Sequence, residues 1–113
     1  MNINATIKKQ YLDMILNGAK TTEYRDMSTY WTERIVETSR YKGKTTQEII
    51  DGLQQGSLAL YTKPISQITF MCNKQRATYQ VLGISVYQGY KFYAIRLGKQ
   101  LSTNTIKDDN KEE

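Results

Sequence analysis

The chain of 113 residues has a formal net charge of +5 and 39% hydrophobic residues, which predicts one domain with a single core. It contains one cysteine, Cys72, and no histidine, which excludes an internal disulfide. Structural zinc sites and histidine-dependent nucleophiles are disfavoured for the same reason. We therefore expect a site without metal or cofactor, built from Lys, Arg, Asp, Glu, Tyr and Thr.

Positive charge is concentrated in the second half of the chain. Residues 1–51 contain eight Lys or Arg and seven Asp or Glu, whereas residues 52–107 contain seven Lys or Arg and no acid. An acid-free basic segment suits a polyanionic partner such as RNA, because phosphate neutralisation by Lys and Arg supplies most non-specific nucleic-acid affinity. Many mildly basic proteins have no such partner, so the charge leaves both interpretations open.

The first residues do not resemble a targeting segment. Residues 1–5 lack the charged and apolar regions of a signal peptide, and no apolar run approaches the ~20 residues of a membrane span. We therefore expect a cytoplasmic protein without a membrane partner.

The first quarter of the chain predicts a strand, a helix and a second strand. Residues 1–7 favour a strand, and residues 8–17 favour a helix whose apolar positions recur at helical spacing. Gly18 lies where a helix ends with a left-handed residue. Residues 20–25 are β-prone through their threonines and tyrosine.

Two further helices are predicted by their N-terminal capping residues. Ser28 is a suitable N-cap for a helix over residues 28–38. Thr45 and Glu48 match a capping box at the start of a short helix that ends near Gly56.

The remainder of the chain predicts strands. The expected strands cover residues 58–61, 65–71, 77–87 and 92–97, with a bulge at Gly83. Short strands and early helices predict a small α+β domain over residues 1–100, with a mostly antiparallel sheet that closes toward a barrel. Residues 101–113 are charged and aperiodic at their end, which predicts a disordered tail.

Three charged residues, Lys20, Glu23 and Arg25, interrupt the otherwise β-prone segment. A strand gains little stability from such charges, so a binding cleft is one explanation, and an exposed strand face is the other. Strand alternation places Glu23 and Arg25 with Thr21 on one face, and Lys20 with Thr22 and Tyr24 on the opposite face.

The run from Tyr11 to Arg25 resembles the ASCH domain (activating signal cointegrator homology), which is marked by a helix followed by Gly-x-Lys-x-x-Glu-x-Arg. The sequences Tyr30-Trp31, with Arg34 nearby, and Ile-Arg-Leu-Gly-Lys at 95–99 resemble small single-domain members common in phages. The resemblance implies a PUA-like β-barrel flanked by two or three helices, with a cleft beside the block at residues 18–25.

The resemblance also implies recognition of RNA, nucleotides or modified nucleosides. One bacterial branch hydrolyses N4-acetylcytidine with a Lys in the block, a Thr three residues later and a Glu on a later strand. Lys20 matches the first, but Glu23 stands at the Thr position and residues 52–107 contain no acid. We therefore rank a binding module above a hydrolase, in which Lys20 and Glu23 would be the catalytic groups.

The candidate ligand-binding residues come from the block and the following helix. Lys20 and Arg25 suit phosphate, Glu23 suits the edge of a base, and Trp31 suits stacking. Glu23 alternatively forms a structural ion pair, and Trp31 alternatively packs in the core. The full set is Lys20, Thr22, Glu23, Arg25, Trp31 and Arg34.

A second candidate surface combines aromatic residues and cations for single-stranded RNA. Its nucleic-acid contacts are Lys74, Arg76, Tyr90, Lys91 and Arg96, with Tyr87 and Tyr93 as further aromatic neighbours. A third class of function is also open: a phage-type accessory protein that binds a host protein in the cytoplasm of a bacterial host.

Overall fold

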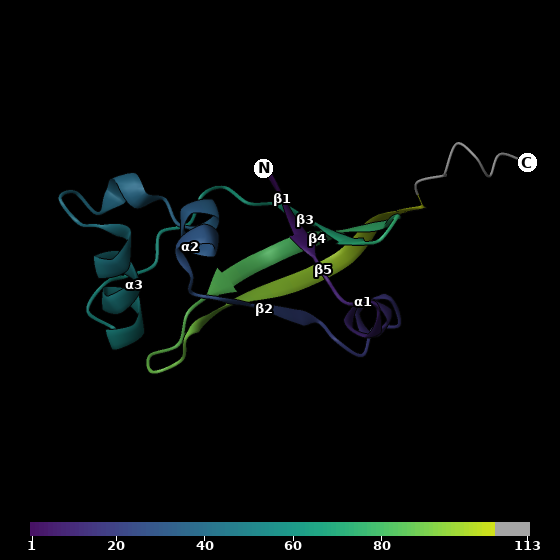
Figure 1. Ribbon diagram of the computed structural model, residues 1–113, viewed down its shortest axis with the longest axis horizontal. Coiled ribbons are helices and arrows are strands. Elements are labelled where there is room, and N and C mark those ends of the chain that lie inside the picture. The colour runs from purple at the N-terminus through teal and green to yellow at the C-terminus, as the bar shows by residue number, and fades with distance from the viewer. Residues whose placement is uncertain (106–113) are drawn as a thin grey trace, which may run out of the picture.

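The computed structural model describes residues 1–105 and shows an α+β fold in which a mixed five-stranded sheet curls into a half-barrel (Figure 1). The elements in chain order are β1 (Asn2–Thr6), α1 (Lys9–Leu16), β2 (Thr22–Asp26), α2 (Thr29–Ile35), a 3-10 turn (Thr38–Arg40), α3 (Thr46–Gln55), β3 (Gln67–Cys72), β4 (Gln75–Ser85) and β5 (Phe92–Thr105).

The strand order in the sheet is β1-β3-β4-β5-β2, so β1 and β2 are its two edges. The β1–β3 pairing is parallel, and the other three pairings are antiparallel. This confirms a mostly antiparallel sheet. The register shifts between Val81 and Gly83, which confirms the predicted irregularity in the long strand β4.

The core fills the inside of the curl. Alternate side chains of β1 and β3 are buried, and α2 contributes Trp31 and Ile35 to the same core. The hydroxyls of Thr32 and Tyr93 form a hydrogen bond of 2.7 Å within it. Figure 1 shows α1 near one end of the sheet and the helices α2 and α3 near the other.

The predicted helix boundaries are confirmed by their caps, with one difference. Gly18 has a φ of +84°, and Ser28 Oγ accepts a hydrogen bond from the Trp31 backbone N–H at 3.1 Å. The capping box of Thr45 and Glu48 is complete. The helix predicted over residues 28–38 ends at Ile35, because the next residue is extended and bridges to Thr62.

The predicted strand over residues 58–61 is wrong. A side chain satisfies its backbone groups: the Tyr41 hydroxyl donates to Ala59 O at 2.6 Å and accepts from the Tyr61 N–H at 2.9 Å. The backbone of this segment therefore hydrogen-bonds to the Tyr41 side chain instead of to a neighbouring strand of the sheet.

The predicted end of the last strand is also wrong. Strand β5 continues past Gly98 to Thr105, because its last residues pair with the segment Gln75–Thr78 of β4. The first part of the predicted tail at 101–113 is thus a strand, and residues 106–113 lie outside the described residues.

Gly52 lies inside α3 because a side chain occupies the space beside it. A Cβ at this position would lie 2.4 Å from Leu58 Cδ1 and 2.5 Å from Leu58 Cγ. Alanine favours a helix over glycine by about 1 kcal/mol, but overpacking costs about 1–3 kcal/mol. The close contact therefore outweighs the helix propensity.

We expect Gly52→Ala to lower the free energy of unfolding by about 1 kcal/mol, measured by urea denaturation. The further substitution Leu58→Ala should cost less in the Gly52→Ala background than in the wild type, because it relieves the contact. A gain in stability from Gly52→Ala would contradict this explanation.

Candidate functional site

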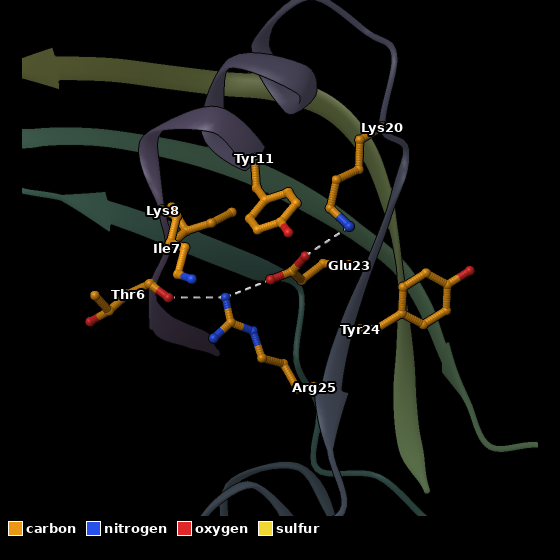
Figure 2. Close-up of a pocket in the computed structure, with 8 residues that line it drawn as sticks. All are labelled: Thr6, Ile7, Lys8, Tyr11, Lys20, Glu23, Tyr24 and Arg25. Carbon is orange, nitrogen blue, oxygen red and sulfur yellow. Dashed lines mark hydrogen bonds and ion pairs between the residues drawn. The ribbon is translucent and has the colours of Figure 1, made fainter. Parts of the chain in front are cut away.

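An open cleft of about 370 Å³ lies between β2 and the junction of β1 with α1 (Figure 2). It is lined by Thr6, Ile7, Lys8, Tyr11, Lys20, Glu23, Tyr24 and Arg25. Since β1 and β2 are the two edges of the sheet, the cleft occupies the open seam of the half-barrel. Chain connectivity produces this position, because α1 connects one edge strand to the other.

Glu23 is the central charge of the cleft and is only 5% exposed. Its Oε1 lies 3.2 Å from Lys20 Nζ, and its Oε2 lies 2.5 Å from Arg25 Nη2. Both carboxylate oxygens are therefore ion-paired. The three charged residues that the sequence analysis singled out form one continuous network of ion pairs, in the order Lys20, Glu23, Arg25.

Arg25 connects the two edges of the sheet. Its Nη2 donates to the backbone O of Thr6 at 3.1 Å, and its guanidinium carbon lies 5.2 Å from the centre of the Trp31 ring. Its Nε is buried without a hydrogen-bond partner. Arg25 therefore lies between the tryptophan and the carboxylate of Glu23, and only part of its donor capacity is used by the protein.

Lys20 reaches the cleft although strand alternation assigns it to the other face. Strand β2 begins at Thr22, so the alternation does not apply to residue 20. The Lys20 backbone N–H donates to Met14 O at 3.0 Å, which ties the segment after Gly18 to the end of α1. Its ammonium also lies 5.4 Å from the centre of the Tyr24 ring.

Five of the eight lining residues were absent from the set predicted from the sequence: Thr6, Ile7, Lys8, Tyr11 and Tyr24. Lys8 is the N-cap of α1 and makes no side-chain capping hydrogen bond. Ser, Thr, Asp or Asn is preferred at this position, and a cation is unfavourable beside a helix N-terminus. A lysine at a predicted helix start was therefore a usable signal, whereas nothing local distinguished Tyr11.

The other candidate ligand-binding residues do not line the cleft. Thr22 lies on the outer side of β2, beside a neighbouring hollow. Trp31 is buried in the core behind Arg25, which bears out the core alternative. The Arg34 guanidinium lies over the exposed Tyr30 ring, 3.4 Å from its centre, and donates to Tyr30 O.

The predicted nucleic-acid surface is divided between distant places on the β4–β5 hairpin. Lys74 lies in the turn before β4 and Arg76 at the start of that strand, whereas Tyr90 and Lys91 lie in the turn at its far end. Arg96 lies within β5 and is exposed.

Tyr93 does not belong to the aromatic surface with which it was grouped. It is fully buried and hydrogen-bonded to Thr32, because its place in β5 points its ring into the curl of the sheet.

Two features that often suggest a function are absent from residues 1–105, the part of the chain that the structure describes. This part of the chain has no group of three or more Cys, His, Asp or Glu placed to hold a metal ion. None of its helices has the length and apolar character needed to cross a membrane.

No family model, curated protein or solved structure matches the chain. The chemistry of the cleft therefore carries the functional argument. Its lining contains three cations, Lys8, Lys20 and Arg25, against the carboxylate of Glu23. An excess of positive charge beside a hydrogen-bond acceptor suits an anionic ligand that also carries N–H or O–H donors.

We expect Glu23→Gln to lower the free energy of unfolding by about 1–3 kcal/mol, because it leaves Lys20 and Arg25 as partly buried cations without a counter-charge. Urea denaturation measures this change. The matched control is Asp13→Asn, which removes an exposed ion pair with Lys9 and should have a much smaller effect on stability. Equal effects of the two substitutions would contradict the role of Glu23.

Proposed function

We propose that this protein is a binding module for RNA or nucleotides and that the ligand occupies the cleft at Lys20, Glu23 and Arg25. One observation carries the proposal: a nearly buried carboxylate is held between two cations in an open cleft, which a third cation, Lys8, also lines. Phosphate would be attracted by the excess positive charge, and Glu23 would accept hydrogen bonds from a base or ribose.

A purely structural role explains this arrangement less well. Charges that leave water pay a desolvation penalty, so a buried ion pair often stabilises a fold no better than apolar residues of similar volume. Here the side chains of Lys20 and Arg25 are 18% and 17% exposed, and that of Glu23 is 7% exposed. Partial burial beside an open cleft suits charges that a ligand can still reach.

The size of the cleft fits one nucleotide. Small-molecule pockets usually have volumes of about 300–1,000 Å³, and the cleft is near the lower end at about 370 Å³. In this arrangement Lys8 and Lys20 supply positive charge for a phosphate, while the ring of Tyr11 supplies a flat wall. Figure 2 shows the Tyr11 ring projecting from α1 into the space between these lysines.

The resemblance to the ASCH domain supports the same proposal. Three of the four block positions shared with that family, Lys20, Glu23 and Arg25, line the cleft, and the fourth, Gly18, follows the end of α1. A PUA-like barrel and a phage-type origin remain implications of this resemblance, and a cytoplasmic location remains an expectation from the sequence.

The hydrolase alternative gains no specific support. Glu23 is the one carboxylate among the eight residues that line the cleft, and both of its oxygens are ion-paired. General acid–base catalysis needs a group that exchanges a proton with the substrate, and a doubly paired carboxylate is poorly suited to that task. Binding of a host protein is the remaining alternative, and the experiment below separates it from nucleotide binding.

We expect Lys20→Ala to weaken binding of adenosine monophosphate and of a single-stranded RNA decamer by about tenfold or more, since it removes a charge-assisted phosphate contact. The fluorescence of Trp31, the single tryptophan, is a suitable readout because Arg25 lies against its ring. Affinity for the decamer should fall as salt rises, with a log–log slope of about −0.7 for each neutralised phosphate.

The matched control is Lys9→Ala. Lys9 is adjacent to the cleft residue Lys8 but pairs with Asp13 on the exposed face of α1, so its removal should leave both affinities within about twofold. Equal losses in the two variants, or no binding of either ligand by the wild type at low salt, would overturn the proposal and favour a protein partner.

A further inference from the structure

Four aromatic side chains form a cluster on the outer side of the sheet, away from the core. The cluster, here called the aromatic platform, consists of Tyr24, Tyr87, Tyr90 and Phe92. These four residues alone line a hollow of about 330 Å³. Tyr24, Tyr87 and Tyr90 are 51%, 53% and 57% exposed, so the platform presents a contiguous apolar surface to solvent, which commonly marks an interaction site.

The rings of the platform contact one another edge-on or at a tilt. Tyr24 meets Phe92 at a centroid distance of 5.0 Å and an interplanar angle of 76°, and Tyr90 meets Phe92 at 5.5 Å and 50°. Tyr87 meets Tyr90 at 6.4 Å and 83°. None of these pairs is parallel, and Tyr24, Tyr87 and Tyr90 are each about half exposed, which leaves ring surface on which a planar ligand can stack.

Backbone hydrogen bonds hold the platform in place. The turn that carries Tyr87 and Tyr90 is closed by a bond of 3.0 Å from the Tyr90 N–H to Tyr87 O. The same turn is anchored to α3, because the Gly89 N–H donates to Gln54 O at 2.9 Å. Two of the exposed rings therefore lie on a fixed turn, which lowers the entropy lost when a ligand binds.

The platform is continuous with the cleft through Tyr24. This residue lines both the cleft and the hollow of the platform, and Figure 2 shows its ring on the opposite side of β2 from Arg25. Lys20 joins the two sites, because its ammonium contacts both Glu23 and the face of the Tyr24 ring. A nucleic-acid chain that leaves the cleft past Lys20 would therefore pass directly onto the platform.

The charges around the platform favour a polyanion. Arg96 is paired with Thr22 across the β2–β5 ladder, and its guanidinium lies against Gly83 on the same outer face as Tyr24. Lys91 is exposed between two platform residues. Asp26, in register with Phe92, is the acid at the edge of the platform. Around the platform there are thus three cations, Lys20, Arg96 and Lys91, against the carboxylate of Asp26.

We propose that the bases of a single-stranded nucleic acid stack on the aromatic platform, while the nucleotide at one end of that nucleic acid occupies the cleft. The inference rests on the proposed function and extends it from one nucleotide to a chain of several. Stacking on tyrosine and phenylalanine tolerates any base, because every base has a planar face, and the nearby cations meet the phosphates. The ligand class is therefore an oligonucleotide bound with little sequence preference.

The test compares a short ligand with a long one in a variant that truncates the platform alone. We expect Tyr87→Ala/Tyr90→Ala to weaken binding of a labelled uridine decamer about fivefold to a hundredfold, measured by fluorescence anisotropy. The affinity of this double variant for uridine monophosphate, measured by Trp31 fluorescence, should stay within about twofold of the wild-type value, because neither tyrosine lines the cleft. Tyr61→Ala is the matched control: Tyr61 is 41% exposed and lies outside the platform, and its loss should leave decamer binding unchanged.

The outcomes separate this inference from the proposed function. If decamer affinity is unchanged in the platform variant while Lys20→Ala still weakens binding of both ligands, base stacking on the platform is overturned and the proposal for the cleft stands. Loss of decamer binding in the platform variant, without any effect of Lys20→Ala, would overturn the cleft and leave the platform. Failure of the wild type to bind either ligand would overturn both. Thermal melting of each variant verifies that the fold is retained, which the exposure of both tyrosines leads us to expect.

Discussion

The contact of Arg25 with both edge strands is the interaction on which the site depends. The curled sheet ends at β1 and β2, which approach each other without forming a ladder. A guanidinium on β2 crosses this seam to the Thr6 carbonyl of β1 and also holds Glu23 of its own strand. A closed ladder would leave no space here, and a wider seam would leave the edges open to pairing with other chains. A polar side chain at the seam keeps both a cleft and a defined edge.

The choice of charged residues at the seam has a physical consequence. Apolar side chains would pack the same gap with equal or better stability, because they have no desolvation penalty. They would also remove the positive charge to which the proposed function assigns the attraction of a phosphate. Within the cleft, the single negative charge of Glu23 does not neutralise the two positive charges of Lys20 and Arg25, and Lys8 adds a further cation. In the proposed function, ligand binding and structural support therefore come from the same side chains.

Local sequence patterns predicted the parts of the fold that depend on neighbouring residues. The caps at Ser28 and Thr45 and the left-handed Gly18 were predictable because each acts within a few residues. The common face of Glu23 and Arg25 followed from strand alternation. Long-range contacts were not predictable: the Tyr41 hydroxyl replaces strand pairing at residues 59 and 61, and pairing with β4 extends β5 beyond Gly98. The positions of Lys8 and Tyr11 in the cleft likewise depend on how the sheet curls.

The parallel pairing of β1 with β3 makes the cleft dependent on contacts between distant parts of the chain. Asn2 pairs with Gln67, so the first strand has no neighbour in the sheet until the chain has been synthesised beyond its midpoint. Contacts of such long sequence separation form slowly, because a large loop must close first. The local hairpin of β3 and β4 needs no such closure. The wall that Thr6 and Lys8 give the cleft therefore depends on a strand pairing that closes a loop of more than half the chain.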